Sequence, residues 1–181
     1  MFRNLKPDIK CADIYTLDTE SLRRGGVRGL FFDIDNTMEP YSTPKPGARL
    51  SEWLEGLTAE GFVIGILSNA RQERIAKFVG GFPPELRDRI LYVYKAAKPL
   101  KKGFRKLLAD AGLRAEEGAM IGDQLFTDIW GANRMAMHSI LTKPISFRDE
   151  PQIMLKRLLE APVLFLYHRK KRKNNNFVLP E

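Results

Sequence analysis

Residues that could carry out chemistry on a phosphate group follow four short apolar stretches of this chain. Residues 33–37 read Asp-Ile-Asp-Asn-Thr, residues 68–69 read Ser-Asn, residues 98–99 read Lys-Pro, and residues 122–128 read Gly-Asp-Gln-Leu-Phe-Thr-Asp. Each motif is uninformative alone. Their order, and their common position behind apolar stretches, indicate a single site.

The first motif offers a nucleophile and a proton donor. Phosphoryl transfer needs an in-line nucleophile, a proton for the leaving group and positive charge around the transferred oxygens. Asp33 can be the nucleophile, because a carboxylate can form an aspartyl-phosphate. Asp35 stands two residues further on and can protonate the leaving oxygen, then activate water.

A divalent cation is expected beside these carboxylates, since they would otherwise repel a phosphate dianion. Mg²⁺ prefers carboxylate and phosphate oxygens in octahedral geometry. Asp33 and Asp123 are the predicted side-chain ligands, with Asp128 as a further ligand or as the holder of a bound water. Ser68 is expected to donate a hydrogen bond to a phosphate oxygen, and Lys98 to add a fixed positive charge.

The apolar stretches themselves predict the strands that position this site. They cover residues 29–32, 62–67, 90–93, 118–121 and 139–141 and are apolar nearly throughout, which is typical of strands buried on both faces of a parallel sheet. Apolar residues at helical spacing predict helices over 50–57, 104–111 and 125–135. Alternating strands and helices indicate an α/β fold, in which ligands bind at the carboxyl ends of the strands.

In this order the motifs resemble the HAD (haloacid dehalogenase-like) phosphatase superfamily. The resemblance implies a three-layer α/β/α Rossmannoid fold with a mostly parallel five-stranded sheet in the order 5-4-1-2-3. It gives the residues named above the same roles, and it adds the main-chain carbonyl of Asp35 as a magnesium ligand.

A narrower resemblance extends over roughly residues 5–144. Leu-Lys-Pro-Asp at 5–8, residues 29–36, Ala-Lys-Pro at 97–99 and residues 122–128 are similar to the YqeG-type HAD IIIA subgroup. That subgroup includes phosphatidylglycerophosphate phosphatases of bacteria, mitochondria and plastids. It therefore implies conversion of phosphatidylglycerophosphate to phosphatidylglycerol, with a phospholipid headgroup as the substrate.

The spacing of the motifs leaves no room for a large cap domain. There are 33 residues from Asp35 to Ser68 and 30 from Ser68 to Lys98, which the expected helices and strands already fill. An uncapped site is open to solvent and can admit a bulky substrate such as a lipid headgroup.

The end of the chain differs in composition. We expect a HAD-like phosphatase domain with an N-terminal extension over 1–146, and a C-terminal helix with a basic tail over 147–181 that contains five consecutive basic residues at 169–173. The net charge of +8 favours anionic partners. The tail is predicted either to bind an anionic membrane surface or to be a solvated segment; nucleic acid is a less favoured partner.

Two bulk properties bear on location. The chain has one cysteine and no apolar run near the roughly 20 residues that span a bilayer. We therefore expect a cytoplasmic protein, with a peripheral position at the inner face of a membrane as the alternative.

Three questions stay open at this stage. Asn36 and Thr37 either cap the turn after Asp35 or contact the phosphate, and with Asn69 they are the predicted substrate-binding residues. The substrate could instead be a phosphoprotein, a nucleotide or a sugar phosphate. A catalytically idle HAD scaffold that binds RNA or a protein is the alternative of another class.

Overall fold

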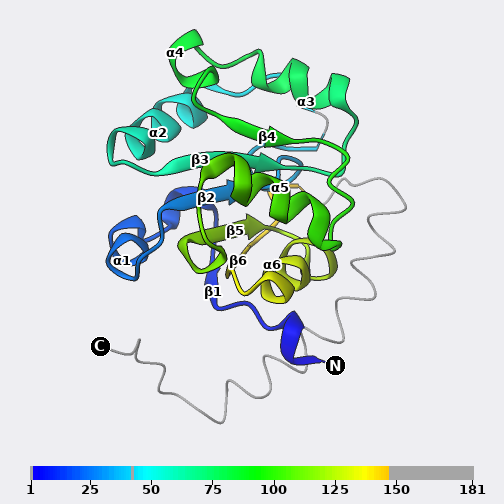
Figure 1. Cartoon of the computed structure of the whole chain (residues 1–181). Coiled ribbons are helices and arrows are strands. Elements are labelled where there is room, and N and C mark those ends of the chain that lie inside the picture. The colour runs from blue at the N-terminus through cyan, green and yellow to red at the C-terminus, as the bar shows by residue number, and fades with distance from the viewer. Residues whose placement is uncertain (1, 42, 147–181) are drawn as a thin grey trace.

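A single parallel sheet of six strands forms the centre of the molecule (Figure 1). The structure is a computed structural model and describes residues 2–41 and 43–146. The strands are β1 (Ile9–Cys11), β2 (Gly29–Phe32), β3 (Val63–Leu67), β4 (Leu91–Val93), β5 (Gly118–Gly122) and β6 (His138–Thr142), in the spatial order β1-β6-β5-β2-β3-β4.

The five predicted strands are all present, in the predicted relative order. β6, β5, β2, β3 and β4 correspond to the expected order 5-4-1-2-3. The sheet has six strands rather than five because β1 adds to its edge, with Ile9 opposite Ile140. β1 has the sequence Ile-Lys-Cys, which is too short and too polar to stand out as a buried strand.

Helices cover both faces of the sheet, as expected for three layers. They are α1 (Thr19–Arg24), α2 (Ala48–Ala59), α3 (Gln72–Val79), α4 (Pro84–Arg87), α5 (Lys101–Ala111) and α6 (Trp130–Met135), with short 3-10 turns at Phe2–Leu5, Ile14–Thr16 and Ala115–Glu117. Side chains of adjacent strand residues point to opposite faces. Accordingly Phe32 packs in one core cluster with Leu54 of α2, and Phe31 in the other with Phe104 of α5.

Two of the predicted helices are confirmed and the third is divided. α2 and α5 contain the predicted segments 50–57 and 104–111, and α5 ends at Gly112, whose φ of 65° lies in the left-handed region that glycine tolerates. Residues 125–135 form a π-helical turn, η4 (Leu125–Ile129), followed by α6. This π-helical turn positions Asp128, as described in the next subsection.

The connections that could hold a cap domain are short in this structure. Between β2 and β3 the described chain contains a loop and α2, and between β3 and β4 it contains α3 and α4. No helix in the described part of the chain is long and apolar enough to cross a bilayer. The expected C-terminal helix and basic run lie outside the described residues, so the division at residue 146 and the role of the tail stay predictions.

Candidate active site

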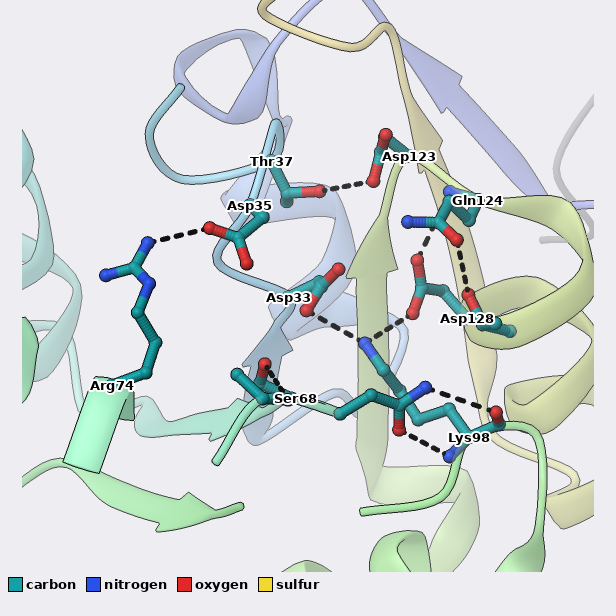
Figure 2. A network of polar contacts seen from close by, with 12 residues as sticks. Asp33, Asp35, Thr37, Ser68, Arg74, Lys98, Asp123, Gln124 and Asp128 are labelled. Atoms are coloured by element: carbon teal, nitrogen blue, oxygen red, sulfur yellow. Dashed lines mark hydrogen bonds and ion pairs between the residues drawn. The ribbon is translucent and has the colours of Figure 1, made fainter. Parts of the chain in front are cut away.

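The carboxyl ends of the two central strands bring the predicted metal ligands together. Asp33 follows β2 and its N–H donates to the carbonyl of Ile121 in β5 (3.0 Å), so Asp33 and Asp123 emerge side by side. One carboxylate oxygen from each of Asp33, Asp123 and Asp128 lies within 4.8 Å of the other two, and all three residues are buried. Residues up to 95 positions apart in the chain thus share one small volume (Figure 2).

The π-helical turn returns Asp128 to the end of β5. Its Oδ2 accepts a hydrogen bond from the N–H of Gln124 (3.2 Å), which fixes the carboxylate against the start of the turn. Gly122 is needed for this arrangement, because a side-chain carbon there would overlap the Asp128 carboxylate. π-helical turns inside helices are frequent at functional sites.

Lys98 joins two of these carboxylates. Its Nζ lies 2.9 Å from Oδ1 of Asp33 and 2.7 Å from Oδ1 of Asp128, and its side chain is 2% exposed. Burial alone would lower the pKa of Lys98, but the two carboxylates outweigh it and raise that pKa. Lys98 is therefore a permanent cation at the centre of the site.

Burial has the opposite consequence for Asp128. It raises the pKa of this carboxyl to about 6, with the neighbouring charge of Asp33 acting in the same direction and Lys98 opposing both. Three buried carboxylates and one ammonium give these four side chains a net charge of −2 when all are ionised. A divalent cation would balance this charge.

The same cluster fits such a cation in its geometry. An octahedral Mg²⁺ holds its oxygens at about 2.1 Å, so opposite ligands are separated by roughly 4.2 Å. Carboxylate oxygens within 4.8 Å of each other reach that spacing with small side-chain movements. Asp33, Asp123 and Asp128 could hold the ion. The side chain of Asp35 does not belong to this cluster, and its main-chain carbonyl as a ligand stays a prediction.

Asn69 positions Lys98 through the backbone. Its Oδ1 accepts from the N–H of Lys98 (2.7 Å) and its Nδ2 donates to the carbonyl of Lys98 (3.3 Å). Ser68, which is buried, uses its main-chain atoms to join the ends of β3 and β4, while its Oγ accepts from the N–H of Ala70 (3.2 Å). The Ser68 hydroxyl still has a proton to donate to a phosphate oxygen. Contact of Asn69 with substrate stays a prediction.

Asn36 and Thr37 shape the turn that follows Asp35. The N–H of Asn36 donates to the carbonyl of Glu39 and that of Thr37 to the carbonyl of Ile34, and Asn36 takes a left-handed φ of 63°. The Thr37 hydroxyl donates to Oδ1 of Asp123 (3.3 Å) and so orients a predicted metal ligand. These contacts favour the turn-forming alternative, and phosphate binding by either residue stays a prediction.

Asp35 is held by a residue that the sequence did not single out. Nη2 of Arg74, on α3, lies 2.7 Å from Oδ1 of Asp35, and Nη1 donates to the carbonyl of Thr43 (2.8 Å). The pair stands at the edge of the site, with both side chains about one quarter exposed (Figure 2). Arg74 thus ties the loop after β2 to α3 and fixes the orientation of Asp35.

Comparison with known proteins is consistent with this geometry. Residues 38–135 match the family of haloacid dehalogenase-like hydrolases. The chain is also 32% identical to the "Probable phosphatase YqeG" of Bacillus subtilis, over 91% of this chain and 92% of that protein. The chain belongs to the haloacid dehalogenase-like hydrolases.

Other relatives of this HAD protein carry more specific names. The "Phosphatidylglycerophosphate phosphatase 1, chloroplastic/mitochondrial" of Arabidopsis thaliana is 31% identical over 91% of this chain, and the chain spans 48% of that protein. The chloroplastic enzyme of the same name from Chlamydomonas reinhardtii is 30% identical over 85% of this chain and 59% of that protein. The family and these phosphatase relatives together identify this protein as a phosphatase that hydrolyses phosphoric monoesters.

Solved structures support the fold. A protein from Listeria monocytogenes matches with a TM-score of 0.55 at 21% identity, covering 69% of this chain and 85% of that chain. A haloacid dehalogenase-like family hydrolase from Xanthomonas campestris matches with a TM-score of 0.51 at 12% identity, covering 82% and 95%. Members of this family generally use a divalent metal, and the buried acidic cluster fits that use. The idle-scaffold alternative finds no support in this site.

Proposed function

We propose that this HAD phosphatase is magnesium-dependent and hydrolyses the terminal phosphate of phosphatidylglycerophosphate through an aspartyl-phosphate on Asp33. The observation that carries the chemistry is the buried cluster of Asp33, Asp123 and Asp128 around the ammonium of Lys98. Mg²⁺ bound there would offset the repulsion between the carboxylates and the substrate phosphate.

In the first step a carboxylate oxygen of Asp33 attacks the phosphorus atom. The new bond is an acyl phosphate, and the bond from phosphorus to the lipid glycerol oxygen breaks with its electron pair going to that oxygen. Asp35 in its protonated form gives the leaving oxygen a proton, which yields phosphatidylglycerol. Lys98 steadies Asp33 through its 2.9 Å contact, and Ser68 donates to an equatorial oxygen.

In the second step water releases the phosphate. Asp35, now ionised, takes a proton from the water, whose oxygen attacks phosphorus while the bond to Asp33 breaks. The Asp33 carboxylate is restored, inorganic phosphate is released, and Asp35 is again protonated. Arg74 orients the carboxyl of Asp35 through its 2.7 Å contact with Oδ1, and the same carboxyl must serve the leaving oxygen and the water in turn.

The choice of substrate rests on two kinds of support. Two relatives at 30–31% identity are named for phosphatidylglycerophosphate. In addition, the loop and helices between the site-forming strands contain no inserted domain within the described residues, so a lipid headgroup can approach. A further relative, from Pyrococcus furiosus, is named as a glyceraldehyde 3-phosphate phosphatase and is 32% identical over 60% of this chain, which makes that compound the sharpest competitor.

The test is phosphate release from a panel of substrates with Mg²⁺ and with EDTA. Phosphatidylglycerophosphate in mixed micelles, glyceraldehyde 3-phosphate and p-nitrophenyl phosphate should all be compared at equal enzyme concentration. We expect the highest kcat/KM for the lipid and no turnover in EDTA. A kcat/KM for glyceraldehyde 3-phosphate above that for the lipid would overturn the substrate assignment and leave the phosphatase chemistry in place.

The matched control is the Asp33→Asn variant. It keeps the size of the side chain but removes the nucleophile, so we expect phosphate release to fall by at least about a thousandfold. Its melting temperature should stay close to that of the wild type, because Asn preserves the packing and Lys98 keeps its 2.7 Å pair with Asp128. Activity retained in this variant would refute the assignment of Asp33.

A further inference from the structure

We propose that the carboxyl edge of the sheet is itself a membrane-docking surface for an anionic bilayer, so that the active site opens toward the lipid. The inference starts from the large apolar side chains that the described residues leave exposed. They are Tyr92, Tyr94, Leu100 and Ile145, with 38–57% of their surface exposed. We call these four residues the apolar rim.

Three residues of the apolar rim lie at the carboxyl edge of the sheet, on both sides of the catalytic centre, and the fourth, Tyr92, lies within β4. Tyr94 follows β4 directly, at the carboxyl edge, and Leu100 stands two residues after the catalytic Lys98. On the other side of the site, the N–H of Ile145, which follows β6, donates to the carbonyl of Asn36 (3.0 Å) in the turn after Asp35. Single exposed apolar residues are ordinary on any protein, but their concentration at one functional edge indicates an interaction surface.

The charge around the apolar rim matches an anionic partner. Apart from the buried Lys98, residues 91–109 contain five Lys or Arg and no Asp or Glu, and residues 129–146 also lack an acidic residue. Lys95, Lys102 and Lys143 are exposed. Lysines interspersed with exposed aliphatic and aromatic residues are typical of surfaces that meet anionic lipid headgroups.

A hollow between β4 and α5 extends this surface. Its volume is about 370 Å³, and it is lined by Tyr92, Tyr94, Lys95, Lys102 and Lys106, among others. Tyrosine is favoured at the level of lipid headgroups, where its ring is apolar and its hydroxyl stays hydrated. Lys106 is paired with Asp110 (2.8 Å), so the hollow offers two rings and the ammonium groups of Lys95 and Lys102 at one concave place, which suits a phosphodiester headgroup of the bilayer.

The surface leads directly into the catalytic loop. Lys95 and Ala97 both have left-handed φ angles, 46° and 52°, which are uncommon outside glycine. The N–H groups of Lys95 and Ala96 donate to the carbonyls of Ala70 (2.9 Å) and Ser68 (3.0 Å), which ties the chain between the hollow and Lys98 to the end of β3. Docking at this edge would place the mouth of the site at the headgroup layer. A membrane-bound phosphate ester could then reach Asp33 without leaving the bilayer. This consequence rests on the proposed lipid substrate, whereas the docking surface does not.

The direct test places tryptophan at the apolar rim of the full chain. Leu100→Trp and Ile145→Trp variants are mixed with vesicles of 70% phosphatidylcholine and 30% phosphatidylglycerol, with or without brominated acyl chains. We expect bromine to quench both new tryptophans beyond the wild-type signal of the two native ones. Arg114→Trp, at the opposite edge before β5, should show no added quenching. Absence of quenching at positions 100 and 145, or equal quenching at 114, would overturn the proposal.

Two matched double variants test whether the lysines near the apolar rim contribute to vesicle binding. Lys95→Gln/Lys102→Gln should weaken vesicle binding by about 10- to 25-fold at low salt, because each Lys near an anionic surface contributes up to about fivefold in affinity. Arg28→Gln/Arg114→Gln removes the same charge from the opposite edge and should leave binding unchanged. Equal losses in the two double variants would show only a general charge effect and would contradict the docking surface.

These outcomes separate docking from the proposed substrate, because the vesicles contain no phosphatidylglycerophosphate. Quenching at the apolar rim together with no turnover of the lipid would retain the surface and overturn the substrate. Turnover of the lipid in micelles without any quenching would retain the substrate and overturn the docking surface.

Discussion

Replacing Lys98 by methionine should destabilise the protein strongly, and much more in EDTA than in Mg²⁺. Methionine fills a similar volume but leaves the carboxylates of Asp33 and Asp128 buried with no ammonium 2.9 and 2.7 Å away. Breaking a buried ion pair by removing one partner costs about 3–5 kcal/mol, because the remaining charge is uncompensated. For a domain of this size the melting temperature should fall by roughly 6–20 °C.

The assay is thermal unfolding of both proteins in EDTA and in millimolar Mg²⁺. A cation held by the acidic cluster would restore part of the lost charge balance, so the variant should gain more from Mg²⁺ than the wild type gains. The control is Lys106→Met, whose pair with Asp110 (2.8 Å) is exposed. Exposed pairs contribute less than about 1 kcal/mol, so this variant should melt close to the wild type.

The destabilisation of the Lys98→Met variant should be smaller in acid. Burial already raises the pKa of Asp128 to about 6 in the wild type, and loss of the ammonium can only raise it further. A carboxyl whose folded-state pKa is raised gives stability that is lost as the pH rises through that value. The destabilisation in EDTA should therefore be smaller at pH 5 than at pH 8.

Adding Asp128→Asn provides the decisive comparison. The double variant Lys98→Met/Asp128→Asn removes the repulsion as well as the ammonium, so it should be more stable than Lys98→Met alone by at least about 1 kcal/mol. If Lys98→Met unfolds within 1 °C of the wild type, or if the double variant is no more stable than the single one, the charge-balance reasoning is wrong.

Three further predictions concern other residues. Arg74→Met should lower kcat by about tenfold with little change in melting temperature, because Asp35 loses its orienting contact. An unchanged kcat in phosphatase assays would rule out this positioning role. Gly122→Ala should weaken Mg²⁺ binding, measured by calorimetry, and destabilise the fold by about 1–3 kcal/mol, because the added carbon would overlap the Asp128 carboxylate. The control Gly56→Ala, in an open part of α2, should be neutral or stabilising. Equal effects of the two substitutions would contradict the overlap with the acidic cluster. Burial, helped by a nearby carboxylate, raises the pKa of the Cys11 thiol to about 11. Alkylation of Cys11 at pH 8, followed by whole-protein mass spectrometry, should therefore be roughly 100-fold slower than for an ordinary thiol and should still accelerate above pH 9. A rate that levels off near pH 9 would exclude the raised pKa.

The sequence predicted the parts of the structure that depend on local patterns. Five continuous apolar stretches became five strands, and helical spacing correctly located α2 and α5. Four of these strands are buried as expected, whereas β4 lies at the edge of the sheet and exposes Tyr92. The convergence of Asp33, Asp123 and Asp128 was also predictable, since each follows or lies near the carboxyl end of a strand in a parallel sheet.

Contacts between distant segments could not be predicted in the same way. Arg74 lies within α3, six residues beyond Ser68, and no motif marks it as the partner of Asp35. Asn69 reaches the backbone of Lys98 across 29 residues of sequence. Both contacts arise from the packing of neighbouring elements, which a pattern along a single chain does not encode.

The most direct measurement is chemical trapping of the phosphorylated enzyme. An acyl phosphate is reduced by borohydride to an alcohol, so a phosphorylated aspartate becomes homoserine. Wild-type enzyme quenched with borohydride during turnover of p-nitrophenyl phosphate in Mg²⁺ should contain homoserine at position 33 by peptide mass spectrometry, and enzyme quenched without substrate should not. Homoserine at position 35, or none at position 33 under full turnover, would contradict the central claim that Asp33 is the nucleophile.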